Sequence, residues 1–410
     1  MVPKLAFVVP TRNRAKMAIA AVNALRTQAG ADVVIVVSDN SPDGDEVRRL
    51  SEFCRALADP RILYIRAGGD LPQGSHWNWA VLEALARSGA THVTVHYDRK
   101  ISRPGAAAAL AGVAAEHPDK VVTYLQDFVS AEPPPLRAWQ HPWTGKLFRI
   151  ATRRTVELSA AGKAQALGQA LPILSNCLVP RTVVEAVVDR FGTLCESTTA
   201  DSCFAYRFCA LFDDYLHLDR PLTVLYGSHR SAGIGYLKGE GGDFADYRAT
   251  WRGEAWLDAA PVPGLNLGYN MLFHEYELVR RSLGDAGRLP PLDRAGCLRD
   301  LAGSLYWIPA GEARNRACTL LREQGWDGEG AVLNVERRLS RLRRFALWVR
   351  QRRALLAALT GAAPATGVSG FRFRSDEEAV RYVLKFPRRR TDDTGHVDIA
   401  DPMEIAATSG

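Results

Sequence analysis

Polar side chains follow two short apolar runs near the start of the chain. The runs, at residues 5–9 and 33–37, are rich in Val and Ile, which is typical of strands covered on both faces of a sheet. Five residues share the positions just after these runs: Pro10, Thr11, Arg12, Asp39 and Asn40. Open α/β sheets bind ligands at the carboxyl ends of their strands, so this carboxylate, guanidinium and hydroxyl predict a ligand site.

The elements that must position these residues alternate between strands and helices. About twenty residues separate the two runs, which is enough for one crossover helix, so the strands should be parallel neighbours. Residues 59–67 contain another strand, residues 75–88 show helical spacing of apolar side chains, and residues 91–96 form a further strand. The pattern predicts an α/β fold.

The segments FVVPTRNR and IVVSDNS resemble the opening of a family 2 glycosyltransferase of the GT-A fold. The resemblance implies a Rossmann-like, mostly parallel central sheet. It also implies that Thr11, Arg12 and Asp39, with Pro10 and Asn40 beside them, hold the nucleotide of a sugar donor. The alternative is a generic βαβ unit in which Asp39 only caps a turn.

A second acidic position follows the strand at residues 91–96. GT-A transferases usually carry Asp-x-Asp here, and the last carboxylate binds Mg²⁺ or Mn²⁺, which neutralises the donor diphosphate. This chain has Asp98-Arg99-Lys100 instead, so a basic residue replaces the second acid. By resemblance, Asp98 would anchor the ribose or the donor sugar.

Three interpretations of this exchange stay open. Lys100, helped by Arg99, could neutralise the diphosphate directly, which would make the protein metal-independent. Alternatively, Asp98 and His229 could hold a metal ion, or the protein could bind a donor without catalysis. We favour the first interpretation, because a lysine ammonium group repels a metal cation.

Two further segments resemble donor-binding parts of the family. Asn78, in the segment LPQGSHWNWA, could face the nucleotide or brace the loop after the first strand. Alternatively, it could form a hydrogen bond that holds its helix to the sheet. His229 and Arg230 follow a strand at residues 222–226 and begin a Gly-rich loop that could close over the donor. A solvated surface loop is the alternative for these two residues.

Asp201 is the candidate general base. The family usually has Glu-Asp before an amphipathic helix, and this chain has Ala200-Asp201. An inverting transfer needs a carboxylate to take the proton of the acceptor hydroxyl. Asp201 could instead be only a helix cap, which is worth about 1 kcal/mol. Whether Glu196 compensates for the missing acid stays open.

Composition narrows the class of protein. The chain has 410 residues, 47% of them hydrophobic and 24% charged, so it is globular and long enough for two or three domains. A net charge of +7 suits anionic ligands, but no zinc-finger spacing or RNA-binding aromatic motif indicates nucleic acid. Seven scattered Cys without a C-x-x-C pair argue against a disulfide framework. No run of about 18 apolar residues indicates a membrane span.

The resemblance fades beyond about residue 242. We expect residues 1–125 and 126–242 to be the donor-binding and acceptor-binding halves of a GT-A domain, and residues 243–410 to be a helical extension. Within the extension, residues 336–359 carry eight Arg between positions 337 and 353 beside an apolar stripe. Such a helix could lie on an anionic membrane surface or pack on the catalytic domain.

The sequence therefore predicts an inverting, metal-independent glycosyltransferase that moves a sugar from a nucleotide-diphosphate donor to a hydroxyl. A UDP-sugar is the expected donor, and the expected acceptor is a glycan or a lipid-linked glycan. The expected location is the cytoplasm, with contact at the inner face of the membrane as an option. A non-catalytic sugar-nucleotide-binding protein and a nucleotidyltransferase are the alternatives.

Overall fold

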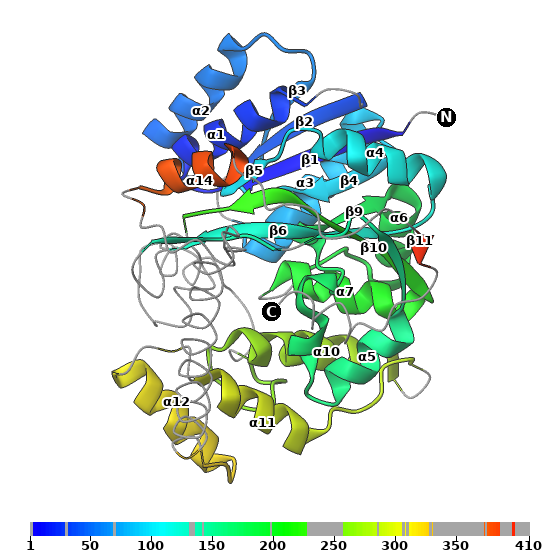
Figure 1. Ribbon diagram of the computed structural model, residues 1–410, viewed down its shortest axis with the longest axis vertical. Helices are drawn as coiled ribbons and strands as arrows, with labels where there is room; N and C mark the ends of the chain where they lie inside the picture. The colour runs from blue at the N-terminus through cyan, green and yellow to red at the C-terminus, as the bar shows by residue number, and fades with distance from the viewer. Residues whose placement is uncertain are drawn as a thin grey trace, which may run out of the picture.

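The computed structural model describes most of the first two-thirds of the chain and parts of the rest. The described residues are 3–28, 32–68, 71–130, 136–141, 143–196, 199–227, 257–284, 287–305, 308, 311–327, 330, 373, 375–385 and 396–397. They form a mixed α/β structure in which helices cover both faces of one central sheet (Figure 1).

The described strands form one 11-stranded sheet in the order β11-β8-β10-β6-β9-β4-β1-β2-β3, with β5 beside β10 and β7 beside β6. Their bounds are β1 Lys4–Thr11, β2 Asp32–Asp39, β3 Ile62–Arg66, β4 His92–Val95, β5 Lys100–Ser102, β6 Val122–Ser130, β7 Arg137–Trp139, β8 Leu147–Ala151, β9 Cys177–Pro180, β10 Asp214–Leu225 and β11 His396–Val397. The boundary that we expected at residues 125 and 126 falls within β6, so the two expected halves share a strand.

The longest strand pairings are parallel. Strands β3, β2, β1 and β4 are parallel to one another, and β6 is parallel to β10, whereas β9 runs antiparallel between β4 and β6. The two apolar runs pair in register, with Val8 opposite Val36. The predicted α/β class with a mostly parallel central sheet is confirmed.

Helices pack on both faces because alternate residues of the strands point in opposite directions. Leu5, Phe7 and Val9 of β1 share a core with α1, α2 and α4, whereas Ala6 and Val8 share a second core with α3, α6 and α7. The bounds of the helices in this part of the chain are α1 Ala15–Arg26, α2 Asp45–Ala56, α3 Gln73–Ser88, α4 Ala106–Glu116, α5 Thr152–Ala160, η1 Ala164–Ala170, η2 Leu174–Asn176, α6 Arg181–Phe191 and α7 Ala200–Leu211.

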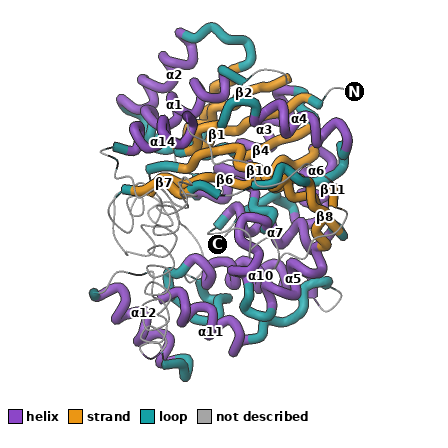
Figure 2. Tube along the Cα trace, in the orientation of Figure 1, coloured by secondary structure: helices purple, strands orange, loops and turns teal. Residues whose placement is uncertain are grey.

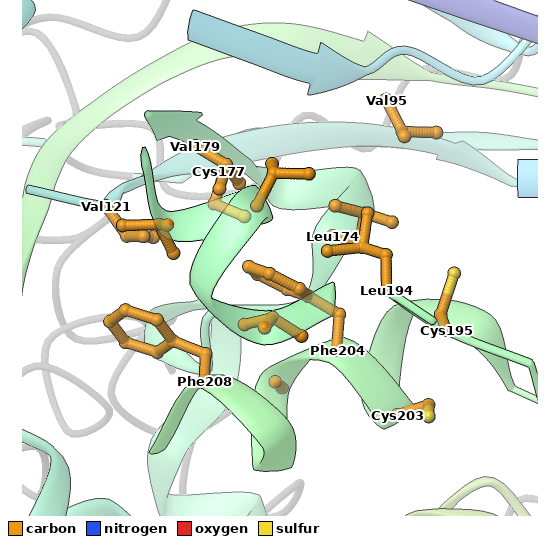
Figure 3. Packing of buried hydrophobic residues seen from close by; sticks show 14 of the residues in the cluster. Val95, Val121, Leu174, Cys177, Val179, Leu194, Cys195, Cys203, Phe204 and Phe208 are labelled. Carbon is orange, nitrogen blue, oxygen red and sulfur yellow. The ribbon is translucent and has the colours of Figure 1, made fainter. Parts of the chain in front are cut away.

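Helix α7 is buried on all sides. Every residue from Ser202 to Ala210 is buried. Phe204 and Phe208 of α7 lie below Leu174 and Val179 from the segment that enters and forms β9 (Figure 3). A helix that is enclosed in this way provides a rigid support for any functional group at its start.

The expected helical extension begins beyond the second half of the sheet. Helices α10 (Gly268–Leu283), α11 (Arg294–Ser304) and α12 (Glu312–Glu323) surround an apolar core of their own, and α10 also packs on α7 (Figure 2). Helix α14 (Asp376–Lys385) returns to pack against β6, β7 and β10. The basic segment at residues 336–359 lies outside the described residues. Among the helices that are described, none is long and apolar enough to cross a membrane.

All seven cysteines are described, and each is a buried free thiol. This agrees with the expectation that the chain has no disulfide framework.

Candidate functional site

Asp39 is held at the carboxyl end of β2, directly opposite Thr11 in the parallel ladder. Its side chain is fully buried, with Oδ2 accepting a hydrogen bond from the Tyr64 hydroxyl (2.8 Å) and Oδ1 accepting one from the backbone N–H of Ser41 (2.8 Å). Burial, together with the charge of Asp39, raises the pKa of Tyr64 and keeps its hydroxyl protonated as a donor. The carboxylate is therefore fixed in one orientation at the sheet edge.

The other residues expected around the nucleotide cluster beside Asp39. Pro10 lies opposite Ser38, and Arg12 donates from Nη1 to the backbone oxygen of Asn40 (2.7 Å). The Ser38 hydroxyl is 2.8 Å from Nε2 of His76, which is buried in α3. Burial, reinforced by the charge of Arg12, lowers the pKa of His76 to about 3, so this imidazole is neutral at physiological pH.

Asp98 lies just after β4 and reaches back to β1. Its Oδ2 accepts a hydrogen bond from the Thr11 hydroxyl (2.9 Å) and forms an ion pair with Nε of Arg14 (2.8 Å), while its side chain is 1% exposed. Arg99 turns the other way and donates to the backbone oxygens of Tyr226 (3.1 Å) and Gly227 (3.3 Å). Asp98 thus joins the ends of β1 and β4.

The surroundings of Asp98 do not fit a divalent cation. A metal at this carboxylate would meet the guanidinium of Arg14, which already pairs with it, and position 100 offers no second acid. In the part of the chain that is described, no group of three or more His, Cys, Asp or Glu residues could hold a metal ion. His229, the second ligand in the alternative that we left open, lies outside the described residues.

Asp201 is the second residue of α7, and Thr199 occupies the N-cap position. Its Oδ2 accepts hydrogen bonds from the Tyr97 hydroxyl (2.8 Å) and the Ser175 hydroxyl (3.2 Å), and its Oδ1 accepts one from the backbone N–H of Ser202 (3.0 Å). The carboxylate therefore contacts the first turn of the helix, but Asp201 is not the N-cap that the capping alternative expected. It also meets two side chains from other segments, which a simple cap does not require.

Lys100 lies on the Asp201 side of the edge. Its Nζ donates to the backbone oxygen of Ser175 and lies 4.7 Å from the centre of the Tyr97 ring. The side chain is fully buried, and burial lowers the pKa of Lys100 to about 7 even though the charge of Asp201 opposes that shift. A role at a donor diphosphate stays a prediction for Lys100.

Other predicted residues have structural partners or lie beyond the described part. Asn78 accepts a hydrogen bond from the backbone N–H of Leu194 (2.7 Å), which ties α3 to the segment after α6 rather than to the loop after β1 or to the sheet. Glu196 pairs with Arg207 at 2.5 Å. His229, Arg230 and the expected lid loop lie outside the described residues.

The three acidic residues are linked across the carboxyl edge of the sheet. Asp39 is opposite Thr11, Thr11 bonds Asp98, and Tyr97, the residue before Asp98, bonds Asp201. Sequence reasoning missed the partners that orient these carboxylates: Tyr64, Arg14, Tyr97 and Ser175. Arg14 and Tyr97 lie near predicted strand ends, and this position could have indicated the contact of Arg14 with Asp98 and that of Tyr97 with Asp201. Nothing in the local sequence singles out Ser175.

Comparisons with known proteins give limited further information. No family model and no curated protein matches the chain. Similar solved structures include S. aureus TarS residues 1–349 (TM-score 0.42, 12% identity, covering 82% of this chain and 91% of that chain) and the same fragment in complex with UDP-GlcNAc (TM-score 0.43, 12% identity, 82% and 92%). A longer S. aureus TarS structure has a TM-score of 0.42 and 14% identity, and the match covers 82% of this chain and 55% of that chain. Identity and TM-score are both low, so the functional proposal rests on the residues of this chain.

Proposed function

We propose that this protein is an inverting glycosyltransferase that uses a nucleotide-diphosphate sugar. The observation that carries the proposal is the gathering of Asp39, Asp98 and Asp201 at one edge of the sheet, through the contacts of Thr11 and Tyr97. These segments are the ones that resemble the donor-binding and base motifs of family 2 glycosyltransferases. A shared edge is what a transfer between a bound donor and an acceptor requires.

In this proposal the end of β2 holds the nucleoside. Asp39 is buried opposite Thr11 and accepts two hydrogen bonds, from Tyr64 and from the backbone of Ser41, which fix the orientation of its carboxylate. Asp98 anchors the ribose or the donor sugar from the end of β4. We propose that the donor-binding and acceptor-binding halves meet within β6 rather than at residues 125 and 126, and that residues 243–410 are a mainly helical extension whose strand β11 pairs with β8.

The chemical step is a single displacement. The oxygen of the acceptor hydroxyl forms a bond to the anomeric carbon while the bond from that carbon to the diphosphate oxygen breaks, and the electron pair leaves with the diphosphate. The hydroxyl proton passes to the carboxylate of Asp201. No covalent enzyme intermediate forms, so no second carboxylate has to act as a nucleophile.

We further propose that the reaction needs no divalent cation. The guanidinium on Asp98 supports the absence of a cation there. Activity should then survive EDTA. Loss of activity in EDTA with recovery on addition of Mn²⁺ would contradict this part of the proposal alone.

A thermal-shift screen of UDP-, GDP-, dTDP- and CMP-sugars, with and without divalent cations, tests the proposed function. A ligand at about 100 times its Kd stabilises a protein by roughly 2.7 kcal/mol, so the correct nucleotide should stand out. We expect a UDP-sugar to give the largest shift and to be consumed with release of UDP. Binding without any turnover would favour a sugar-nucleotide-binding protein. Pyrophosphate release from a nucleoside triphosphate would favour a nucleotidyltransferase.

A further inference from the structure

The carboxylate of Asp201 is oriented by two side chains from distant segments. The Tyr97 hydroxyl, just after β4, and the Ser175 hydroxyl, in η2, both donate to the same oxygen, Oδ2. The Tyr97 ring also packs against Trp77 of α3, with the ring centres 5.3 Å apart. Each donor must keep its place if the carboxylate is to keep its orientation toward an acceptor.

Lys100 contacts both of these donors. Its ammonium group donates to the backbone oxygen of Ser175 and lies over the face of the Tyr97 ring, 4.7 Å from its centre. The attraction between a cation and an aromatic face is strongest at sites shielded from water. Lys100 is completely shielded, with 0% of its side chain exposed. It therefore braces Tyr97 and Ser175 against one another.

We propose that Lys100 is a positioning residue for Asp201, acting through Tyr97 and Ser175. This inference rests on the proposed role of Asp201 as the general base. It differs from the countercharge role, because a charge on the diphosphate would contribute to the binding of UDP as well as to the chemical step, whereas a positioning lysine affects only the chemical step. The geometry supports positioning, since every contact described for Nζ lies on the Asp201 side of the edge.

The charge state of Lys100 makes the proposal testable by pH. The titratable and charged groups around it are Asp201, Cys177, Arg99, His96 and Tyr97. Burial lowers the pKa of His96 to about 3 and raises the pKa values of Cys177 and Tyr97, so these three groups do not change charge near neutral pH. Lys100, with a pKa of about 7, loses its charge as the pH rises through neutrality, and the attraction to the Tyr97 ring weakens with it.

The first experiment separates positioning from countercharge in Lys100→Met and Tyr97→Phe. Lys120→Met is the matched control, because Lys120 precedes β6 at the opposite edge of the sheet, where its Nζ bonds Asp214 at 2.6 Å. Affinity for UDP is measured by calorimetry, and kcat is measured with the sugar nucleotide that the wild type consumes. We expect both site variants to keep their UDP affinity within about twofold and to lose roughly 10- to 100-fold in kcat.

The pH profile and the double variant sharpen the test. Wild-type kcat should decline as the pH rises through about 7, and Lys100→Met should lack this decline. Lys100→Met/Tyr97→Phe should be little worse than the poorer single variant, because residues that act as a unit are not additive. A loss of UDP affinity of tenfold or more in Lys100→Met would overturn the proposal in favour of the countercharge. The proposal would also be overturned if the losses of kcat in the two single variants multiplied in the double variant.

A measurement without ligand distinguishes failure of this inference from failure of the proposed function. If the wild type binds no sugar nucleotide, the proposed function fails, but the contacts of Lys100 can still be tested by urea unfolding of the same variants. For this measurement Tyr97→Leu replaces Tyr97→Phe, because Leu removes the ring that the ammonium group contacts, and we expect the shifts in the unfolding midpoint to be non-additive in Lys100→Met/Tyr97→Leu. Additive shifts would show that Lys100 does not act through Tyr97. If Lys100→Met does not fold, Tyr97→Phe decides the question, since it removes only a hydroxyl and should lower kcat without changing UDP affinity.

Discussion

The two carboxylates at strand ends and the carboxylate of α7 are held by different kinds of contact. Asp39 and Asp98 are almost completely buried, and their partners come from the first hundred residues, within the parallel β3-β2-β1-β4 part of the sheet. Asp201 depends on Tyr97 from that part, on Ser175 from η2, and on α10, which packs against α7. The proposed donor side, with Asp39 and Asp98, is therefore built from neighbouring βα units. The proposed base, Asp201, is placed by segments that are distant along the chain.

Replacing the base should have the largest effect on the reaction. Asp201→Asn keeps the shape of the side chain but cannot take the proton of the acceptor, so we expect kcat to fall about 10²- to 10⁴-fold with UDP affinity nearly unchanged. Asp213→Asn, at an exposed Asp that pairs with Arg288, is the matched control and should keep its kcat. Unchanged turnover in Asp201→Asn would remove Asp201 from the mechanism and leave it with a structural role at the first turn of α7.

Among changes at the proposed donor side, loss of the Asp98 contacts should lower the free energy of unfolding the most. Asp98→Ala leaves Arg14 beside a buried gap and removes the partner of the Thr11 hydroxyl. We expect a loss of about 2–3 kcal/mol in the free energy of unfolding, below the roughly 3–5 kcal/mol of a fully buried pair because Arg14 is 21% exposed. Urea unfolding measures the loss.

Asp98→Asn is the control for this change, because it keeps an oxygen that can accept from Thr11 and should lose less stability. Both variants should also bind UDP more weakly than the wild type. Equal stability of Asp98→Ala and the wild type would mean that Arg14 and Asp98 are not coupled in solution.

Two buried histidines, His76 beside Ser38 and His96 beside Tyr97, should make the stability of the protein sensitive to acid. Burial, the main cause, lowers the pKa values of His76 and His96 to about 3, below the unfolded value of 6.5. Above pH 6.5 neither state is protonated. As the pH falls below it, the unfolded state gains protons that the native state excludes, so the free energy of unfolding should fall by up to about 1.4 kcal/mol per pH unit for each histidine.

Unfolding in urea at several pH values tests this expectation with His76→Gln and His96→Gln. In each variant the free energy of unfolding should decline less steeply with falling pH than in the wild type. Its value above pH 6.5, where the histidine is neutral in both states, measures the loss of packing and is subtracted. A decline as steep as that of the wild type in His76→Gln would mean that this imidazole accepts a proton in the native state.

The difference between the two sides also explains what the sequence could predict. The strands around Val8 and Val36, their parallel pairing and the polar residues at their ends follow from local apolar runs and from the length of the connection. The partners of Asp201 do not, because Ser175 lies in a short 3₁₀ helix with no periodic pattern and reaches Asp201 only through the tertiary packing of η2 on α7. The direction of Lys100 was equally hidden, since its residue type suits both a phosphate and a buried carbonyl.

The smallest expected effect tests whether the helical extension contributes to the base side. Thr199, at the N-cap of α7, donates from its backbone N–H (2.9 Å) and its hydroxyl (2.8 Å) to Oε1 of Glu275, which is buried in α10. Thr199→Val keeps the backbone bond and removes the second, so we expect a loss of about 1 kcal/mol in the free energy of unfolding. Because the start of α7 also carries Asp201, kcat should fall, but only by a few fold, while UDP affinity stays unchanged.

Thr319→Val is the matched control. It removes a hydroxyl that bonds Asn315 of its own helix at an exposed position of α12, and it should change neither stability nor kcat. If Thr199→Val matched this control in kcat, α10 would stabilise the fold without helping to place the base, and the base side would depend on Tyr97 and Ser175 alone.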